Sequence, residues 1–328
     1  MQKIAALLLL TCFISSVDLF LARKSSMAFA AVTWPDKPLT FVVAFGTGGA
    51  IDTTARRVAK YMEKECGVTV NVVNRPGAGG LVGSTYYMGL PDDGYSILFG
   101  NQILFSSSIV LKNASYGIDD ISLLSFLYID PECISVRQDS PYRTFADLQA
   151  AIKAAPGTVR MATTSGSVIQ ALHKNLREQL ELDFRSVYFD STTEKQAALL
   201  GGHIDVNAGG VVTALRNGDR VLLVMGSERA VELPDVPTVN EILQKPINLG
   251  GTTIFLAVKR SMKEKHPDRF AWLLEAFEKT IDTPGYRQEA KEAGMENKTI
   301  WLGPEKSDLM NREIHAAVEE YKDVLEGQ

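Results

Sequence analysis

Strands and helices are expected to alternate along most of this 328-residue sequence, and this alternation limits the fold more than any other feature. The apolar run Leu39–Phe45 reads as a buried strand, and residues 52–64 then carry apolar side chains at helical spacing. A second apolar run at residues 68–73 leads into another glycine turn, residues 74–80, and a further helix. Such alternation indicates a parallel sheet with crossover helices and therefore an α/β protein.

The alternation resumes after Pro141 and continues to the end of the chain. We expect helices at 145–154, 167–180 and 193–200, strands at 159–162, 204–207, 221–225 and 254–258, and tail helices at 270–280, 285–293 and 304–325. Two α/β lobes joined by strand crossovers near residues 125–135 and 250–258 fit this order. A cleft between the lobes is the expected ligand site.

The first thirty residues differ from the rest and predict export. Lys3 precedes an apolar stretch that continues to Val17, and Ala28-Phe29-Ala30 offers the small residues that signal peptidase reads. Asp18 ends the stretch before it reaches the roughly 20 residues of a spanning helix, which disfavours a membrane anchor. The net charge of -5 and the lack of a basic block disfavour a nucleic-acid partner.

The two glycine turns do not match the common nucleotide fingerprints. The stretch Gly46–Ile51 has isoleucine where the dinucleotide motif needs its third glycine, and Gly77–Ser84 lacks the Gly-Lys-Ser/Thr of a phosphate loop. Both turns still place glycine backbone between a strand and a helix start, where free N–H groups suit an anion of any kind. One such turn alone would favour a purely structural role. Two in succession at one sheet edge favour a binding site.

Other polar residues leave alternatives open. Thr163–Ser167, again between a strand and a helix, fits a ligand contact and an ordinary helix cap equally well. Asp52 fits a base or a helix-start residue, and Arg75 fits a carboxylate clamp or a loop support. Cys66 and Cys133 fit a disulfide or two buried thiols.

Motifs for catalysis and metal binding are thin. The four histidines fall into no metal-ligand spacing, and no nucleophile elbow or C-x-x-C pair is present. The sequence therefore predicts neither an enzyme nor a metal or cofactor site.

Several phrases together resemble one family, the extracytoplasmic solute receptors of tripartite tricarboxylate transporters, also called the Bug family. The phrases are Trp34-Pro35-x-x-Pro38, Gly48-Gly49-x-x-Asp52, Asn74-Arg75-Pro76-Gly77-Ala78-Gly79-Gly80, Asp93-Gly94-Tyr95, "FDSTTEKQAALLGGHIDV" and "LPDVPTVNE". Together they cover nearly the whole chain after residue 30.

The resemblance implies a two-lobed periplasmic binding protein of type II-like fold that closes on a small organic carboxylate in the cleft between its lobes. It implies a signal peptide at 1–30, a first lobe from 31–130 plus 255–328, and a second lobe from 131–254. The ligand-binding residues implied are Phe45, Gly46, Thr47, Gly48, Gly49, Asp52, Gly77, Ala78, Gly79, Gly80, Asn101, Thr164, Ser165, Gly166, Ser167, Asp190, Ser191 and Thr192.

The sequence departs from the family pattern on the side that selects the ligand. Ala44-Phe45-Gly46-Thr47 lacks the two prolines usual in the first turn, and Thr192-Thr193 replace a glycine pair. Gln170 stands where many relatives carry histidine, and Gly209-Gly210 replace polar or acidic residues. Carboxylate binding is expected to survive these changes, whereas the identity of the carboxylate does not follow from them.

By this resemblance the partners are a di- or tricarboxylate, an aromatic acid or an acidic amino acid, and the membrane permease subunits of a tripartite transporter. No cofactor and no nucleic acid are expected, and a monomer in the periplasm is expected. A sensory receptor that presents its ligand to a membrane kinase is the alternative with the same fold. An exported α/β hydrolase is a weaker alternative, because the sequence gives no nucleophile–base pair.

Overall fold

Seven strands within the described part of the chain form one sheet in the order β2-β1-β3-β9-β4-β7, with β8 also paired to β4. The computed structural model describes residues 34–163, 168–189, 192–226, 228–244, 251–296 and 298–326. The strands of this sheet are β1 (Leu39–Val43), β2 (Val70–Asn74), β3 (Ser96–Gly100), β4 (Ile121–Val136), β7 (Asn207–Gly210), β8 (Arg220–Val224) and β9 (Gly251–Lys259). A second, two-stranded sheet pairs β5 (Arg160–Thr163) with β6 (Arg185–Tyr188).

The chain divides into two units, Met1–Lys37 and Pro38–Gln328, and the named elements all belong to the second. Helices before β4 are α2 (Ala50–Cys66), α3 (Leu81–Met88) and α4 (Gln102–Lys112), with short 3-10 turns η1 (Ala78–Gly80) and η2 (Ile118–Asp120). Between β4 and β9 lie α5 (Phe145–Ala154), α6 (Val168–Leu180), α7 (Thr192–Leu200), α8 (Val211–Arg216) and α9 (Val239–Ile242). After β9 come α10 (Arg260–Lys265), α11 (Pro267–Asp282), α12 (Pro284–Glu292), α13 (Gly303–Glu320) and α14 (Lys322–Leu325).

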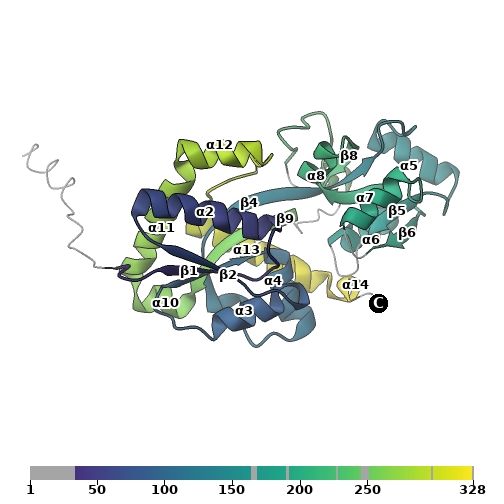
Figure 1. Cartoon of the computed structure of the whole chain (residues 1–328). Helices are drawn as coiled ribbons and strands as arrows, with labels where there is room; N and C mark the ends of the chain where they lie inside the picture. Colours follow the sequence, from purple (N-terminus) through teal and green to yellow (C-terminus); the bar gives the residue numbers. More distant parts are fainter. Residues whose placement is uncertain are drawn as a thin grey trace, which may run out of the picture. The chain divides into compact units, whose positions relative to one another are not determined.

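The strands β1, β2 and β3 are parallel, as the alternation predicts, and α2 and α3 lie on opposite sides of β1 and β2 (Figure 1). Helix α2 forms because its apolar residues recur at helical spacing, and it ends where predicted. Gly67 adopts the left-handed conformation (φ 68°), and its N–H donates to the carbonyl of Glu63. The helix α5 has the predicted bounds and begins with a capping box made by Thr144 and Asp147.

The 16-residue strand β4 changes pairing partners at Pro131. Residues up to Pro131 pair with β9, whereas Glu132–Ser135 pair with β7 on one edge and Cys133–Val136 pair with β8 on the other. Proline has no N–H to donate, so it suits the point where the ladder changes partner. Opposite it lies Gly251, where a Cβ would come within 2.0 Å of the Asp130 carbonyl oxygen. We call the part built on β1, β2, β3 and β9 the first lobe, and the part built on β5–β8 the second lobe.

The structure corrects the sequence expectation of parallel pairing throughout. The pairs β3–β9, β4–β9, β4–β7 and β4–β8 are all antiparallel. The strands β4 and β9 run in opposite directions because β4 carries the chain into the second lobe and β9 carries it back. The predicted domain boundaries, after residue 130 and before residue 255, fall inside β4 and β9. The helix α4 and the strand β6 were not predicted at all.

Two element boundaries also differ from prediction. The strand expected at 204–207 lies instead at Asn207–Gly210, because buried Val206 pairs with Met161 of β5 before the ladder with β4 begins. The tail helix expected at 304–325 is divided into α13 and α14 at Tyr321. Among the described residues, no helix combines the length and apolar character needed to cross a membrane.

Candidate functional site

The first glycine turn, Phe45–Ala50, follows β1 and leads directly into α2. Phe45 is half-buried, and the rest of the turn is exposed. Gly48 has a positive φ of 85°, a conformation that favours glycine, whereas Gly49 is extended and precedes the helix (φ -73°, ψ 169°). The N–H groups of the first turn of α2 have no helical partner, because no carbonyl precedes them at the right distance. The turn therefore presents backbone donors at its surface.

Asp52 holds this turn from inside. Its side chain is only 1% exposed, and its carboxylate accepts from the Gly48 N–H at 2.8 Å and from the Asn74 amide at 2.9 Å. Arg56, one helical turn later, donates to the same carboxylate at 3.0 Å. Burial raises the pKa of Asp52, but the hydrogen bonds from Arg56, Gly48 and Asn74 outweigh burial and keep the pKa below its usual value. Asp52, predicted as a ligand residue, thus fixes the turn's conformation through an internal network.

The second glycine turn, Gly77–Gly80, follows β2 and precedes α3. Every residue in it has a positive φ: 140° at Gly77, 49° at Ala78, 65° at Gly79 and 97° at Gly80. Lys112, at the end of α4, donates from its ammonium to the Ala78 carbonyl at 2.8 Å. The backbone conformation of this turn is therefore set by its glycines and by one lysine. It does not depend on a buried carboxylate.

The two turns touch each other. A Cβ built on Gly80 would lie 3.0 Å from the Phe45 ring, so the ring packs directly against the glycine backbone. The Asn74 side chain, just before the second turn, donates to the Phe45 carbonyl at 3.0 Å. Behind both turns, a Cβ on Gly83 would meet the Ala44 Cα at 2.5 Å, which shows how closely α3 approaches the end of β1. These contacts confirm the prediction that both turns lie at the same edge of the sheet.

Arg75 supports the second turn. Its guanidinium donates to the Asn74 carbonyl at 3.2 Å and lies over the Tyr86 ring at 4.6 Å from the ring centroid. Of the two interpretations of Arg75, the loop support therefore matches the observed contacts.

Asn101 follows β3 at the same edge, because β1, β2 and β3 run parallel. Its side-chain oxygen accepts from the Leu104 N–H at 3.1 Å, which caps α4. The next residue, Gln102, donates its N–H to the Thr253 hydroxyl of β9 at 3.1 Å. Asn101 thus lies between the glycine turns and the strand that leads to the second lobe.

The second-lobe predictions are largely beyond the described part of the chain. Thr164, Ser165, Gly166, Ser167, Asp190 and Ser191 lie outside the described residues. Thr192 is described as the first residue of α7, and Thr163 as the buried last residue of β5. The strands β5 and β6 are parallel, so the loops that follow them begin at one edge of the small sheet.

Two acidic residues on β4, Asp130 and Glu132, were not predicted from the sequence as part of a site. Asp130 is 4% exposed, and its carboxylate accepts from the Val212 N–H of α8 at 3.2 Å. Burial raises its pKa to about 6, against the lowering effects of that N–H, of Lys298 and of the Tyr128 hydroxyl. Burial likewise raises the pKa of Glu132 to about 7, and the nearby ammonium of Lys195 opposes this rise. The Asp130-Pro131-Glu132 sequence inside an otherwise apolar strand was the signal available.

Lys195, on α7, is the partner of this group from the second lobe. It is 5% exposed, and its ammonium donates to the Ala208 carbonyl of β7 at 2.6 Å. Burial lowers its pKa, while the charge of Glu132 raises it. The carboxylate of Glu132 and the ammonium of Lys195 therefore interact where β4 passes between the lobes. This part of β4 and the start of β9 lie beyond the carboxyl end of β3, since Gly100 pairs with Phe255.

Within the described residues no cluster of three or more His, Cys, Asp or Glu could hold a metal ion. Cys66 is half-buried, Cys133 is buried, and both are free thiols whose pKa burial raises. His173 is buried, its Nδ1 lies 2.8 Å from the Ser186 hydroxyl, and burial lowers its pKa to about 3. It is therefore a neutral core histidine at physiological pH.

Residues 54–320 match the family described as "Tripartite tricarboxylate transporter family receptor", TctC. The match covers well over half of the sequence. The chain belongs to this family. The glycine turns, the α/β lobes and the long β4 are thus features of a TctC receptor, and the resemblance read from the sequence is confirmed.

Curated relatives agree with this assignment. The chain is 27% identical over 239 residues to the UPF0065 protein in the tcbD–tcbE intergenic region of Pseudomonas sp. strain P51, covering 71% of each chain. It is 26% identical over 242 residues to protein BugT of Bordetella pertussis, covering 71% of this chain and 74% of BugT. Across the relatives, the matches span between 64% and 90% of their own lengths.

Solved structures share the fold. A TctC solute-binding protein from Polaromonas has a TM-score of 0.74 at 22% identity, covering 90% of this chain and 100% of its own. MatC from Rhodopseudomonas palustris with bound malate has a TM-score of 0.63 at 22% identity, covering 89% and 100%. A second R. palustris protein, with adipate, has a TM-score of 0.64 at 20% identity, covering 90% and 98%. The two-lobed periplasmic-binding fold of the TctC receptor is therefore established, and its family is one of solute-binding proteins and not of enzymes.

Proposed function

We propose that this TctC receptor captures a small organic carboxylate in the periplasm and delivers it to a tripartite tricarboxylate-type transporter. The observation that carries the proposal is the pair of touching glycine turns at the ends of β1 and β2. Each turn precedes a helix, and unpaired N–H groups at a helix start attract an anion. At the second turn the N–H groups of Gly80 and Val82 donate to the Gly77 carbonyl, so the donors proposed there are the N–H groups of Ala78 and Gly79. Two such starts side by side suit a carboxylate, which has two oxygens to satisfy.

Hydrogen bonds within the protein hold both turns, and this supports a binding role. Asp52 and Asn74 fix the first turn, and Lys112 fixes the second. Pre-organised donors bind more tightly because less conformational freedom is lost on binding. The grip proposed here is made by neutral amides. An arginine–carboxylate pair would be stronger, whereas a receptor must release its cargo.

The second half of the proposed grip comes from the second lobe. The loops after β5 and β6, with Thr164–Ser167 and Asp190–Thr192, are proposed to contact the far side of the ligand. Because β4 and β9 carry the chain between the lobes, a small rotation about residues 130–132 and 251–253 would bring those loops toward the glycine turns. Closure of this kind is proposed to signal the membrane subunits.

Two further parts of the proposal concern ligand and location. MatC holds malate and its R. palustris neighbour holds adipate, so dicarboxylates are the first probes for this chain. BugD, another structural neighbour, is a periplasmic binding protein. We propose that residues 1–30 are a cleaved leader that sends this chain to the periplasm as well.

The proposal is tested with a thermal-shift panel on the chain that begins after Ala30. Malate, adipate, citrate, benzoate and glutamate are added in turn, with a nucleotide and a sugar as controls. A ligand at 100 times its Kd adds about 2.7 kcal/mol of stability. We expect at least one carboxylate to give such a shift. If every carboxylate fails while the nucleotide or sugar succeeds, the proposal is wrong.

A pair of variants distinguishes a loss of carboxylate binding from a loss of folding stability. Gly79→Val places a branched side chain in the second turn at a positive φ of 65°, beside Lys112, and should abolish the shift. Gly67→Val places the same side chain at a positive φ of 68° at the end of α2, where a Cβ meets nothing within 4 Å, and should keep the shift. Circular dichroism checks that both variants fold. Equal binding by the two variants would mean that the second turn is structural only.

A further inference from the structure

The C-terminal segment, residues 303–325, carries one continuous buried seam along its length. The buried positions are Ser307, Asn311, Ile314, Val318, Tyr321 and Leu325. Their spacing alternates between four and three residues, as on one face of a helix. The seam crosses the break between α13 and α14, because Tyr321 and Leu325 continue it. One face of this segment is therefore in contact with the protein from end to end.

The first half of the seam is fixed to the first lobe. The Ser307 hydroxyl accepts from the Phe126 N–H of β4 at 3.0 Å. Gln102 of α4 donates from its side chain to the Asn311 carbonyl at 3.2 Å, and His315 lies 3.0 Å from the Ser106 hydroxyl. The helix α13 packs mainly on β4 and α4. This half is held by polar contacts at buried positions.

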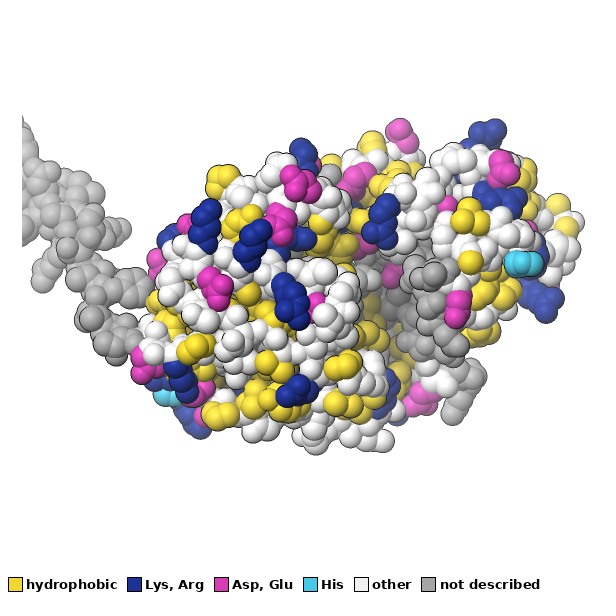
Figure 2. All heavy atoms as spheres, in the orientation of Figure 1, with side chains coloured by type: hydrophobic (Ala, Val, Ile, Leu, Met, Phe, Trp, Pro, Cys, Tyr) yellow, Lys and Arg dark blue, Asp and Glu magenta, His cyan; other side chains and the backbone are white. Residues whose placement is uncertain are grey.

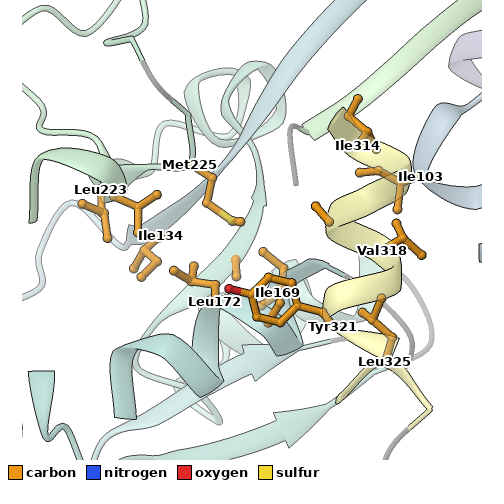
Figure 3. Close-up of a cluster of buried hydrophobic side chains, with 14 of the residues drawn as sticks. Ile103, Ile134, Ile169, Leu172, Leu223, Met225, Ile314, Val318, Tyr321 and Leu325 are labelled. Atoms are coloured by element: carbon orange, nitrogen blue, oxygen red, sulfur yellow. The ribbon is translucent and has the colours of Figure 1, made fainter. Parts of the chain in front are cut away.

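The second half of the seam packs on the second lobe. Tyr321 is 7% exposed, and its hydroxyl accepts from the Asn175 amide of α6 at 2.9 Å. Asn175 is itself held, because Gln179 donates to its side-chain oxygen at 2.6 Å. Figure 3 shows the Tyr321 ring beside Ile169 and Leu172 of α6. Ile314 and Val318, earlier on the segment, lie near Ile103 of α4 in the same view (Figure 3).

The contact between this segment and α6 is narrow. A hollow of about 390 Å³ lies on one part of it, lined by Gln179, Gln244 and Tyr321 among others. A second hollow of about 440 Å³, lined by Gln170, His173 and Val324 among others, borders the same two helices. The described contacts between the segment and α6 thus concentrate on Tyr321, Asn175 and the apolar cluster. Changing those few side chains would release α6 without disturbing a broad interface.

The contacts between α2 and α12 lie within one lobe, in contrast to the contact between the C-terminal segment and α6. Lys60 of α2 pairs with Glu289 of α12 at 2.7 Å, and Tyr61 donates to the same carboxylate at 3.2 Å. Figure 2 shows acidic and basic side chains mixed over these two helices. Both helices belong to the first lobe, so their contacts join no two parts that could move. They provide matched controls.

We propose that the C-terminal segment is a positioning element that fixes α6 relative to the first lobe through Tyr321 and Leu325. The helix α6 begins at Val168, directly after the predicted ligand loop, so its placement sets where that loop meets the glycine turns. The segment thereby adds a third connection between the lobes to those made by β4 and β9. Tyr321 and Leu325 are positioning residues in this arrangement. The role in ligand binding rests on the proposed function above, whereas the mechanical role does not.

The test measures the distance between the lobes directly. Spin labels are attached at Lys64→Cys on α2 and Lys153→Cys on α5, both exposed, in a Cys66→Ser background where buried Cys133 stays unlabelled. Tyr321→Phe removes only the hydroxyl that contacts Asn175, and Leu325→Ala removes the last side chain of the seam. We expect both variants to broaden the distance distribution. We also expect malate or adipate, whichever binds the parent, to bind about five-fold more weakly.

Two control variants make the same kinds of substitution within the first lobe. Tyr61→Phe loses a comparable hydroxyl contact, and Leu273→Ala truncates a fully buried leucine of α11. Neither should change the distance distribution or the affinity, although Leu273→Ala should lower the stability. If Tyr321→Phe and Leu325→Ala behave like these controls in either measurement, the proposal is overturned. If the parent binds no carboxylate, the proposed function fails, and the distance measurement still tests the segment.

Discussion

Two buried aspartates lie in different regions of this receptor, and their pKa values shift in opposite directions. Asp52, below the first glycine turn, has a pKa held under its usual value. Asp130, on β4 between the lobes, has a pKa raised to about 6. Both are nearly inaccessible, at 1% and 4% exposed. The exposed fraction of the side chain alone therefore does not decide the charge of either residue.

The balance between burial and hydrogen-bond donors decides the charge. Asp52 receives hydrogen bonds from a backbone N–H, an amide and a guanidinium, and these compensate the charge for the water it has lost. Asp130 receives one backbone N–H at 3.2 Å and the Tyr128 hydroxyl, with Lys298 at longer range and Glu232 opposing. The glycine turn is thus built around a stable anion, whereas the crossing between the lobes holds an acid that titrates near neutral pH.

The largest effect is expected from Asp52→Ala. This change leaves the Gly48 N–H, the Asn74 amide and Arg56 without their shared acceptor, and we expect about 2–4 kcal/mol of lost stability. The first turn should loosen, so carboxylate binding should weaken as well. Urea unfolding and thermal shift measure the two effects.

Asp147→Ala is the matched control for that variant. Asp147 also accepts backbone N–H groups at a helix start, but on exposed α5 in the second lobe. Its loss should cost much less stability than the loss of Asp52, because the hydrogen bonds of Asp147 are exposed to water, and it should leave binding unchanged. Equal losses in the two variants would contradict the idea that Asp52 forms the centre of a buried network.

A pH-dependent effect of intermediate size is expected from Asp130→Asn. The pKa of Asp130 is higher in the fold, at about 6, than its usual value of 3.8, so folding favours the protonated form. The stability contributed by protonated Asp130 is complete below pH 3.8 and is lost as pH rises through 6. Asparagine carries no charge, so the variant should gain about 1–3 kcal/mol over the parent at pH 8 and little at pH 4.

Denaturant unfolding at both pH values checks this, with exposed Asp139→Asn as the control. A gain that is the same at pH 4 and pH 8 would show that packing, and not charge, separates Asp130 from asparagine.

The smallest effect concerns the glycines of the two turns. Gly79→Ala puts a Cβ at a positive φ of 65°, 3.0 Å from the Lys112 ammonium, and should cost about 1–2 kcal/mol. Gly46→Ala, in the turn that Asp52 holds, should change stability by less than about 0.5 kcal/mol. Thermal unfolding distinguishes the two. A larger loss at Gly46 would mean that the first turn depends on its backbone after all.

Local signals made single elements predictable in both lobes. The helix α2 and its end at Gly67 follow from side-chain spacing and from one glycine, and α5 follows from its capping box. Those patterns involve residues within a few positions of each other, so a sequence displays them directly. The glycine turns were equally visible, because few other residues adopt the conformations of Gly77–Gly80.

What the sequence did not display depends on residues far apart in the chain. The antiparallel pairing of β4 with β9 joins Ile121 to Lys259, and no local pattern encodes such a partner. The break at Tyr321 has the same origin, since the residue caps one helix while its hydroxyl contacts Asn175 of α6. The hydrogen bond between Asn74 and Asp52 likewise joins residues 22 positions apart, and no local pattern displayed it.

The sequence alone therefore determined the α/β class, the glycine turns and the receptor family, because each is carried by neighbouring residues or by short phrases. The tertiary structure alone decided which acids are charged, where the lobes are joined and what the C-terminal segment contacts. Charge and contact depend on the donors and surfaces that folding brings together, and such partners can lie 229 residues apart, as Lys60 and Glu289 do.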